Sequence, residues 1–138
     1  MRLLVDANIL LDVFQNREPY VQDSVKVWKL CETSQDTGFV TALSFANLVY
    51  VMRKELDPEK IEDVYRKLTL IFTFTELNAL DLDRAAAMKW SDFEDALQSV
   101  AAERLKADYI ITRNVRDYLK SSVTALSPAE YLARRTFS

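Results

Sequence analysis

The chain has 138 residues, of which 49% are hydrophobic and 28% are charged, with a formal net charge of −3. A chain of this length fits one domain and can bury roughly two-thirds of its unfolded surface. It contains no histidine, one cysteine and one glycine, which excludes histidine-dependent catalysis, zinc sites rich in histidine or cysteine, and glycine-rich phosphate loops. An enzyme of this composition must use carboxylates, hydroxyls, lysine or arginine. Carboxylates that support hydrolysis point to a hard cation such as Mg²⁺ or Mn²⁺.

The first half of the chain alternates short apolar runs, which are typical of buried strands, with hydrophobic residues at helical spacing. In chain order, the pattern predicts a strand at Arg2–Val5, a short helix at Ile9–Phe14, a break at Asn16–Pro19, a helix at Val21–Cys31, a strand at Gly38–Thr41 and a helix at Ser44–Leu56.

The second half begins with a helix start, because Asp57 is a favoured N-cap and Pro58 suits the first helical position. This helix is followed by a predicted strand at Ile71–Thr75, helices at Asp81–Trp90 and Asp92–Lys106, a strand at Tyr109–Thr112 and a last helix that starts at the capping box Ser127–Glu130. Strands that alternate with helices predict an α/β fold with a central, mostly parallel sheet covered on both faces. We expect residues 1–138 to form a single domain.

The sequence also bears on location. No apolar stretch approaches the about 20 residues of a membrane span. Asp6 and Asp12 interrupt the apolar run at the N-terminus, which disfavours a cleaved signal peptide. The lone Cys31 has no internal disulfide partner, so a reducing cytoplasm is the expected location.

Polar side chains follow the predicted strands. Asp6, Thr41 and Thr112 each stand where a strand is expected to end, and Asp92 and Asp95 lie at the start of the helix over Asp92–Lys106. Because open parallel sheets bind ligands at the carboxyl ends of their strands, we expect these side chains to converge on one site.

A carboxylate cluster of this kind suits the hydrolysis of a phosphodiester, which is shielded by its own negative charge. A divalent ion held by carboxylates from separate segments binds the phosphoryl oxygens and lowers the pKa of an attacking water. The predicted metal ligands are Asp6, Asp95 and Asp92, with Asp117 as a further catalytic candidate, and the predicted supporting polar residues are Asn8, Asn47, Thr112 and Asn114.

Two segments show a family resemblance. VDANILLDV at Val5–Val13 is an apolar strand that ends in Asp followed by a small residue and Asn. DFEDALQSVAAERLKADYIITRNVRDYL at Asp92–Leu119 places Asp-Ala-Leu at the start of a helix rich in small residues, then a strand that ends in Thr-Arg. The chain resembles the PIN-domain family in both segments, and SPAEYL is similar to the closing helix of that family.

The resemblance implies a three-layer α/β/α sandwich and a Mg²⁺- or Mn²⁺-dependent endoribonuclease. Small stand-alone members are often the VapC-like toxin of a toxin–antitoxin pair. The resemblance therefore also implies an RNA substrate, a small antitoxin partner and a homodimer.

Two positions depart from the family pattern. Asn47 stands where a glutamate is usual, and Asn114 stands where an aspartate usually follows Thr-Arg. Both changes remove a negative charge from the pocket, and Asp92, Glu94 and Asp117 are candidates to replace it, because the DFED…TRNVRD form resembles one PIN subgroup. The departures favour an alternative, a catalytically degenerate PIN fold that binds RNA or protein.

Several acidic residues also have ordinary structural interpretations. Asp92 suits a helix N-cap as well as a metal ligand, and Asp117 suits a turn before Tyr118. Glu94 is expected in solvent, where it interacts favourably with the helix dipole, and Asp12 is expected to be a solvated helix residue.

The remaining polar residues also have both a functional and an ordinary structural interpretation. Arg113 and Arg116 flank the Asn114 turn and are predicted to contact the RNA backbone, with solvated arginines as the ordinary alternative. Thr112 either bonds within the site or only ends its strand. The aromatic residues at helical or strand spacing are expected to pack in the core rather than stack on bases; they are Trp28, Phe39, Phe45, Tyr65 and Trp90.

Other phosphoryl-transfer classes fit poorly. A receiver domain needs an acceptor Asp after its third strand, where Ile71–Thr75 leads only to Glu76. A haloacid-dehalogenase-type phosphatase needs Asp-x-Asp after its first strand, where this chain has Asp6-Ala7-Asn8. The acidic net charge argues mildly against a general nucleic-acid binder, an objection that weakens if clustered acids bind metal.

Overall fold

Five parallel strands form the centre of the computed structural model, which describes residues 1–136. Their spatial order is β3-β2-β1-β4-β5. The strands are β1 (Arg2–Val5), β2 (Thr37–Thr41), β3 (Phe72–Thr75), β4 (Tyr109–Ile111) and β5 (Ala125–Leu126). The helices are α1 (Ala7–Phe14), α2 (Val21–Glu32), α3 (Ala42–Val51), α4 (Pro58–Thr69), α5 (Ala79–Met88), α6 (Phe93–Arg104), the 3₁₀ helix η1 (Val115–Tyr118) and α7 (Pro128–Thr136).

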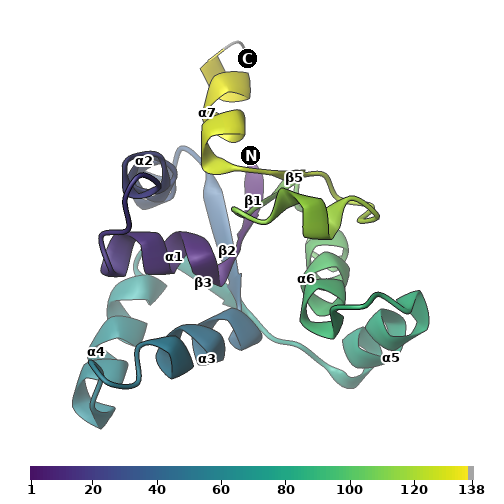
Figure 1. The fold of residues 1–138 in the computed structure, drawn as a ribbon, viewed down its shortest axis with the longest axis horizontal. Helices are drawn as coiled ribbons and strands as arrows, with labels where there is room; N and C mark the ends of the chain where they lie inside the picture. Colours follow the sequence, from purple (N-terminus) through teal and green to yellow (C-terminus); the bar gives the residue numbers. More distant parts are fainter. Residues whose placement is uncertain (137–138) are drawn as a thin grey trace.

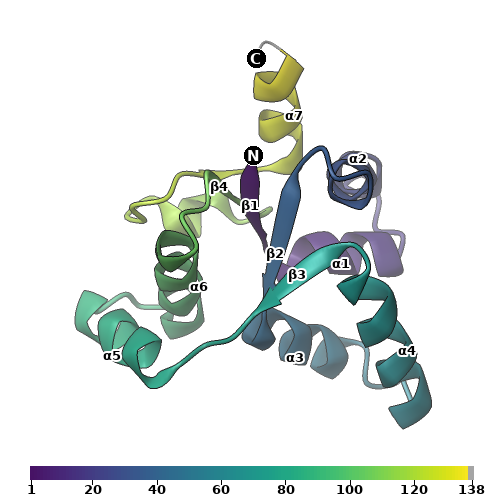
Figure 2. The ribbon, with the colours of Figure 1, turned by 180° about the vertical axis from the view of Figure 1, so that it is seen from behind.

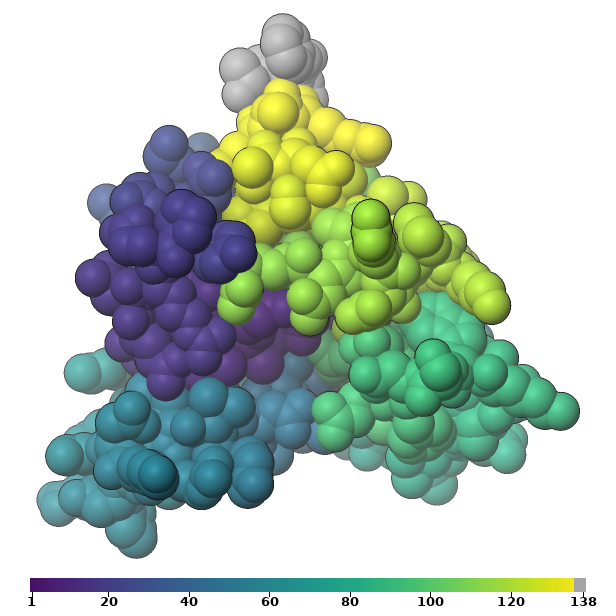
Figure 3. Space-filling model, in the orientation of Figure 1, coloured from purple at the N-terminus to yellow at the C-terminus, as the bar shows by residue number. Residues whose placement is uncertain are grey.

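Helices cover both faces of the sheet (Figures 1 and 2). Leu3 and Val5 of β1 pack with residues of α1, α2, α3, α4 and α7, whereas Leu4 faces the side of α6. All three side chains are fully buried, which is why the strand is a continuous apolar run rather than an alternating one. The predicted α/β/α sandwich is confirmed. In this view the molecule has a roughly triangular outline, and its corners are formed by α7, the α3–α4 pair and the α5–α6 pair (Figure 3).

Within the described residues, the predicted helices and strands are present, but several bounds shift and two short elements, β5 and η1, were not predicted. The predicted helix at Ser44–Leu56 ends earlier, at Val51. Helix α3 begins at Ala42 rather than Ser44, because the hydroxyl of Thr41 accepts a hydrogen bond from the Ser44 amide at 3.0 Å and caps the helix. Strand β5 was not predicted, since two residues are too short to show a pattern. The sheet is parallel at each of its strand pairs.

The predicted helix starts at Asp57 and Ser127 are confirmed. The carboxylate of Asp57 accepts from the Lys60 amide at 2.9 Å. Ser127 and Glu130 form the reciprocal capping box, with each side chain accepting from the backbone amide of the other. Among the helices of residues 1–136, none has both the length and the apolar character needed to cross a membrane.

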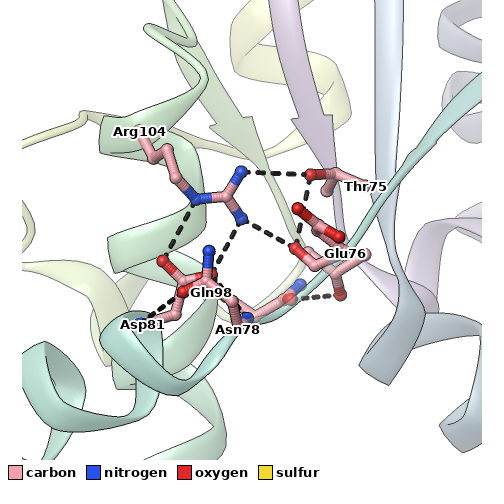
Figure 4. Close-up of polar contacts among 7 residues, drawn as sticks. Thr75, Glu76, Asn78, Asp81, Gln98 and Arg104 are labelled. Carbon is pink, nitrogen blue, oxygen red and sulfur yellow. Dashed lines mark hydrogen bonds and ion pairs between the residues drawn. The ribbon is translucent and has the colours of Figure 1, made fainter.

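An ion pair attaches α6 to α5 and to the segment that precedes α5 (Figure 4). Arg104 donates to both carboxylate oxygens of Asp81, at 3.1 and 2.9 Å, and to the carbonyl oxygen of Glu76 at 2.7 Å. Asn78 and Asp81 also form the capping box of α5. Burial by itself would raise the pKa of Asp81, but the hydrogen bonds from Arg104 and Asn78 and the charge of Arg104 hold it below its ordinary value. The network therefore helps to fix the helix on which Asp95 lies.

Candidate active site

Asp6 lies where β1 ends and α1 begins. Its backbone amide donates to the Ile111 carbonyl of β4 at 3.0 Å, which aligns the two strand ends. One carboxylate oxygen accepts from the Ala7 amide at 2.8 Å as the N-cap of α1, and the other accepts from the Thr112 hydroxyl at 2.9 Å. The bond from Ala7 is local, whereas the bond from Thr112 requires a parallel sheet in which β1 and β4 are neighbours.

The fully buried Thr112 joins three segments of the site. Its hydroxyl donates to Asp6 and accepts from the Asn8 amide group at 3.3 Å and from the Asn114 backbone amide at 3.0 Å. Asn8 in turn accepts from the Arg113 backbone amide at 3.3 Å. The structure thus brings together Asp6, Asn8 and Thr112 as predicted, and the three side chains hold the turn between β4 and η1 in place.

Asp95 lies in the first turn of α6 and faces the buried Tyr118 of η1. The tyrosine hydroxyl donates to the Asp95 carboxylate at 3.1 Å. The Asp92 carboxylate accepts from the Asp95 amide at 3.1 Å and is the N-cap of α6. The N-cap interpretation of Asp92 is therefore confirmed, and a role as metal ligand stays a prediction.

The electrostatics of the site reflect four acids from three segments: Asp6 after β1, Asp92 and Asp95 at the start of α6, and Asp117 in η1. Burial raises the pKa of Asp6, and the charges of Asp117 and Asp92 add to this against the hydrogen bonds from Thr112 and Ala7. Burial and the charge of Asp92 raise the pKa of Asp95 to about 6, with further contributions from Asp6 and Asp117. The four carboxylates therefore repel one another, and the arrangement favours a bound cation.

Asp92, Asp95 and Asp117 line a surface cleft of about 450 Å³, which we call the η1–α6 cleft. Arg116 lies at the same cleft. Its contact with RNA stays a prediction. Asp117 is exposed and belongs to η1, and its amide donates to the Asn114 carbonyl at 3.0 Å.

The two asparagines that depart from the family pattern occupy different surroundings. The side chain of Asn47 on α3 donates to the Glu94 carboxylate of α6 at 3.3 Å, so Asn47 contacts one of the acids proposed to replace the missing charge. Glu94 is exposed, as expected. Asn114 is also exposed and is the N-cap of η1.

The acids of the site do not by themselves surround an ion. Among residues 1–136, no three Asp, Glu, Cys or His side chains are grouped closely enough to hold an ion by themselves. The predicted set of Asp6, Asp95 and Asp92 does not form a closed cage. The available donors are all oxygens, and Mg²⁺ usually keeps several waters and takes only one or two carboxylates. The residues therefore fit a hydrated hard cation.

The expectation that Asp12 is solvated is wrong. Asp12 is fully buried, because it lies on the face of α1 that packs against α2. One of its oxygens accepts from the Ser24 hydroxyl at 3.0 Å and lies 3.1 Å from Nε of Arg113. The Arg113 guanidinium also stacks over the Tyr20 ring at 4.3 Å. Arg113 thus interacts with the α1–α2 pair through its side chain, which leaves it less available for RNA than predicted.

We expect Arg113→Met to lower the free energy of unfolding by about 2 kcal/mol, because it leaves the buried Asp12 carboxylate without its counter-charge. Urea denaturation measures the effect. The double variant Asp12→Asn/Arg113→Met removes both charges and should be more stable than Arg113→Met alone. A double variant less stable than the single variant would contradict a buried ion pair.

Sequence reasoning missed Tyr118 and a buried polar cluster beneath the site. The Thr41 hydroxyl donates to the Gln98 side chain at 2.6 Å, and Gln98 donates to the Ser44 hydroxyl at 3.0 Å. These contacts join β2, α3 and α6. Gln98 follows Asp95 by three residues and so shares its face of the helix, which was the one available signal; Tyr118 had none.

The predicted aromatic core is largely present. Trp28 packs between Phe14 and Phe72, and Phe39 is buried. Tyr65 is more exposed than predicted, at 42%, although its ring contacts Phe45.

Solved structures share this fold at low identity. A toxin–antitoxin complex from Klebsiella pneumoniae is similar with a TM-score of 0.70 and 17% identity over 91% of this chain and 97% of that one. VapBC-1 from nontypeable Haemophilus influenzae matches with a TM-score of 0.68 and 17% identity over 94% and 99% of the two chains. Mycobacterium tuberculosis VapC20, a toxin that cleaves the sarcin-ricin loop, matches with a TM-score of 0.62 and 8% identity over 78% and 86%.

The sequence comparisons agree with the fold. No curated protein sequence matches the chain. The family model described as PIN domain matches residues 2–116, a range that includes Asp6, Asp95 and the turn after β4. With this match over most of its length, the chain belongs to the PIN-domain family.

Proposed function

We propose that the chain is a divalent-metal-dependent endoribonuclease. The observation that supports this best is the pairing of each central carboxylate with a hydroxyl donor. Asp6 accepts from Thr112 at the end of β1, and Asp95 accepts from Tyr118 at the start of α6. The two hydroxyls orient the carboxylates, and the repulsion among the acids is relieved when a cation binds.

In this proposal Asp6 and Asp95 hold the ion, with Asp92 and Asp117 close enough to affect their charge. A bound Mg²⁺ or Mn²⁺ supplies charge for the phosphoryl oxygens and lowers the pKa of a water. Thr112 fixes the rotamer of Asp6, and Arg116 at the η1–α6 cleft is placed to bind a phosphate.

The direct test is incubation of purified protein with a fluorescent structured RNA in Mn²⁺, Mg²⁺ or EDTA. Cleavage in either ion that stops in EDTA is expected. Folded protein that cuts with neither ion would contradict the proposal, as would calorimetry that finds no divalent-ion binding at millimolar concentration.

Thr112→Val is expected to lower the cleavage rate about 10- to 100-fold, the usual effect of removing a group that orients a metal ligand. The substitution keeps the side-chain shape but removes the hydrogen bond to Asp6, together with those from Asn8 and the Asn114 amide. Thr112→Ser, which retains the hydroxyl, should recover most of the rate. Equal loss in both variants would indicate a packing effect instead.

Asn47 and Asn114 favour the second candidate, a PIN fold that binds RNA or protein without cutting it. This candidate predicts RNA binding that EDTA leaves unchanged and no cleavage. Asn47→Glu/Asn114→Asp should then create metal-dependent cleavage, because it restores two charges to the pocket. Active wild-type protein would exclude this candidate.

We also propose that the chain is the toxin of a toxin–antitoxin pair, with a small antitoxin that covers the acidic site. The support is the shared fold with complexes of that description. A small open reading frame directly upstream, whose product restores growth on co-expression, is the expected finding. The proposed homodimer is tested by light scattering of the purified chain.

A further inference from the structure

A buried hydrogen-bond network holds α6 against the end of β2, beneath the proposed metal site. Gln98 is 3% exposed and lies one turn after Asp95, on the same face of the helix. Its side-chain oxygen accepts from the Thr41 hydroxyl at 2.6 Å, and its side-chain nitrogen donates to the Ser44 hydroxyl at 3.0 Å. All three side chains are buried, and no step of the proposed hydrolysis uses them.

Thr41 lies beside Asp6 along the carboxyl edge of the sheet. The register of β1 and β2 pairs Leu4 with Phe39, and two residues further along each strand come Asp6 and Thr41. Gln98 therefore connects α6, the helix that carries the second proposed metal ligand, to the strand end that is next to the first.

Apolar packing does not make this connection at the start of α6. The hydrophobic cluster there contains Ala96, Leu97 and Val100 with residues of α3, α5 and the loop after α5, and within the described residues it includes no strand residue. Ala102, two turns after Asp95, is the residue of α6 that packs with β1 and β2. Apolar contacts tolerate small shifts of a helix, whereas a hydrogen bond requires its donor and acceptor about 3 Å apart.

The far end of α6 is attached separately. Arg104 bonds α5, and it also donates to the Thr75 hydroxyl of β3 at 3.5 Å (Figure 4). Gln98 and Arg104 therefore meet the ends of two neighbouring strands, whose residues Thr41 and Thr75 are paired in register. Of these two contacts, the one from Gln98 lies closer to Asp95 along the helix, so it has the greater influence on where that carboxylate lies.

We propose that Gln98 is a positioning residue, which through Thr41 sets the separation of Asp6 and Asp95 and thereby the affinity of the site for a divalent ion. Oxygen ligands of such an ion lie about 2.1 Å from it, so a small displacement of one carboxylate weakens binding. The charges of Asp6 and Asp95 already interact. The inference rests on the proposed metal-dependent nuclease and deepens it, because it assigns a role to a buried residue outside the acid cluster.

Gln98→Met is the direct test, because methionine is a good helix former that adapts to its surroundings but makes neither hydrogen bond. The Thr41 and Ser44 hydroxyl oxygens lie 3.2 Å apart, so these two side chains keep each other as partners. Calorimetry with Mn²⁺, without RNA, should show affinity about tenfold below wild type. This is the lower end of the range for groups that orient metal ligands, since Gln98 does not bond Asp95 itself. Unchanged affinity would overturn the proposal.

Two substitutions of Thr41 test the same contact from the strand. Valine removes the hydroxyl and serine retains it, so Thr41→Val should bind Mn²⁺ about tenfold more weakly than wild type, and Thr41→Ser should bind it nearly as well. The double variant Gln98→Met/Thr41→Val should bind no more weakly than either single variant, because both remove one shared contact. Equal losses with valine and serine, or losses that multiply in the double variant, would overturn the proposal.

Tyr131→Phe is the matched control for a general loosening of the fold. Tyr131 is buried, and its hydroxyl donates to Asp36 at 2.8 Å. Asp36 directly precedes β2, so this bond lies at the opposite end of the strand from Thr41. The variant should melt at a lower temperature than wild type but bind Mn²⁺ equally well. An equal loss of Mn²⁺ affinity in Tyr131→Phe and Gln98→Met would overturn the proposal.

The same measurements separate this inference from the proposed function. Wild-type protein that binds no Mn²⁺ would contradict both. Wild-type protein that binds Mn²⁺ and cuts RNA, with unchanged Mn²⁺ affinity in Gln98→Met, would overturn only the positioning role. Wild-type protein that binds Mn²⁺ about tenfold more tightly than Gln98→Met but cuts no RNA would support the positioning role and contradict the nuclease.

Discussion

Asp6→Asn is expected to reduce metal-dependent RNA cleavage at least about 100-fold, since the loss of a group that merely orients a ligand already costs about 10- to 100-fold. The fold should be unaffected. Asn and Asp are similarly good N-caps, so the bond from the Ala7 amide that begins α1 can persist. A neutral amide also avoids the burial of charge that raises the pKa of Asp6.

Cleavage rates and thermal unfolding of the same variants check this result. Asp95→Asn should behave like Asp6→Asn. Asp83→Asn, an exposed position on α5, is the matched control and should retain wild-type activity. We expect Asp6→Asn to melt at or above the wild-type temperature while being inactive. Retention of cleavage would exclude Asp6 from the site, and a large drop in melting temperature would indicate a structural role.

Arg104→Met is expected to lower the free energy of unfolding by about 3 kcal/mol. Asp81 is 1% exposed, and removal of Arg104 leaves its carboxylate buried without a counter-charge. The guanidinium also bonds the Glu76 carbonyl, which would lose its partner. Chemical denaturation at pH 7 measures the difference.

The matched control is Arg84→Met. Arg84 also joins α5 to α6, through Glu103 at 3.2 Å, but both side chains are about half exposed. Exposed ion pairs contribute about 0–1 kcal/mol, so this variant should remain close to wild type. Similar losses in the two arginine variants would mean that burial is not the cause.

The pH dependence follows from the pKa of Asp81. Burial would raise this pKa, but Arg104 and Asn78 lower it below the unfolded value of about 3.9. The contribution of the ionised group to stability is therefore full above pH 4 or so and is lost as the pH falls through the folded pKa. In Arg104→Met the effect of burial remains, so Asp81 takes up a proton on acidification. The difference between wild type and variant should be larger at pH 7 than near pH 4, and a constant difference would count against the pair.

Local patterns were sufficient for most of the fold. The strand ends at Asp6 and Thr112 could be predicted because parallel strands bring their carboxyl ends to one edge of the sheet. The capping residues Asp57 and Ser127 were recognisable because capping depends on neighbours three residues apart. Strand β5 was not, because its two residues, Ala125 and Leu126, are paired only through the register set by β4.

The residues that were misinterpreted or missed all depend on contacts between distant segments. The local sequence around Asp12 is typical of a solvated helix residue. In the folded protein α2 covers Asp12, and so does Arg113, which lies 101 positions further along the chain. Gly38 gave no local signal, yet a Cβ there would lie 2.7 Å from Cys31 Sγ. Tyr118 reaches Asp95 only because η1 folds back over α6.

By itself, the sequence determined the order of strands and helices, the apolar faces that form the sheet core and the acids at strand and helix ends, because each depends on residues a few positions apart. The tertiary structure alone decided which charges are buried in pairs, which hydroxyl orients each acid and which loops enclose the η1–α6 cleft. These features depend on the packing of segments that are far apart in the chain, such as those of Asp6 and Thr112, whose positions differ by 106. The cost of burying a polar group is then set by the partner that packing provides.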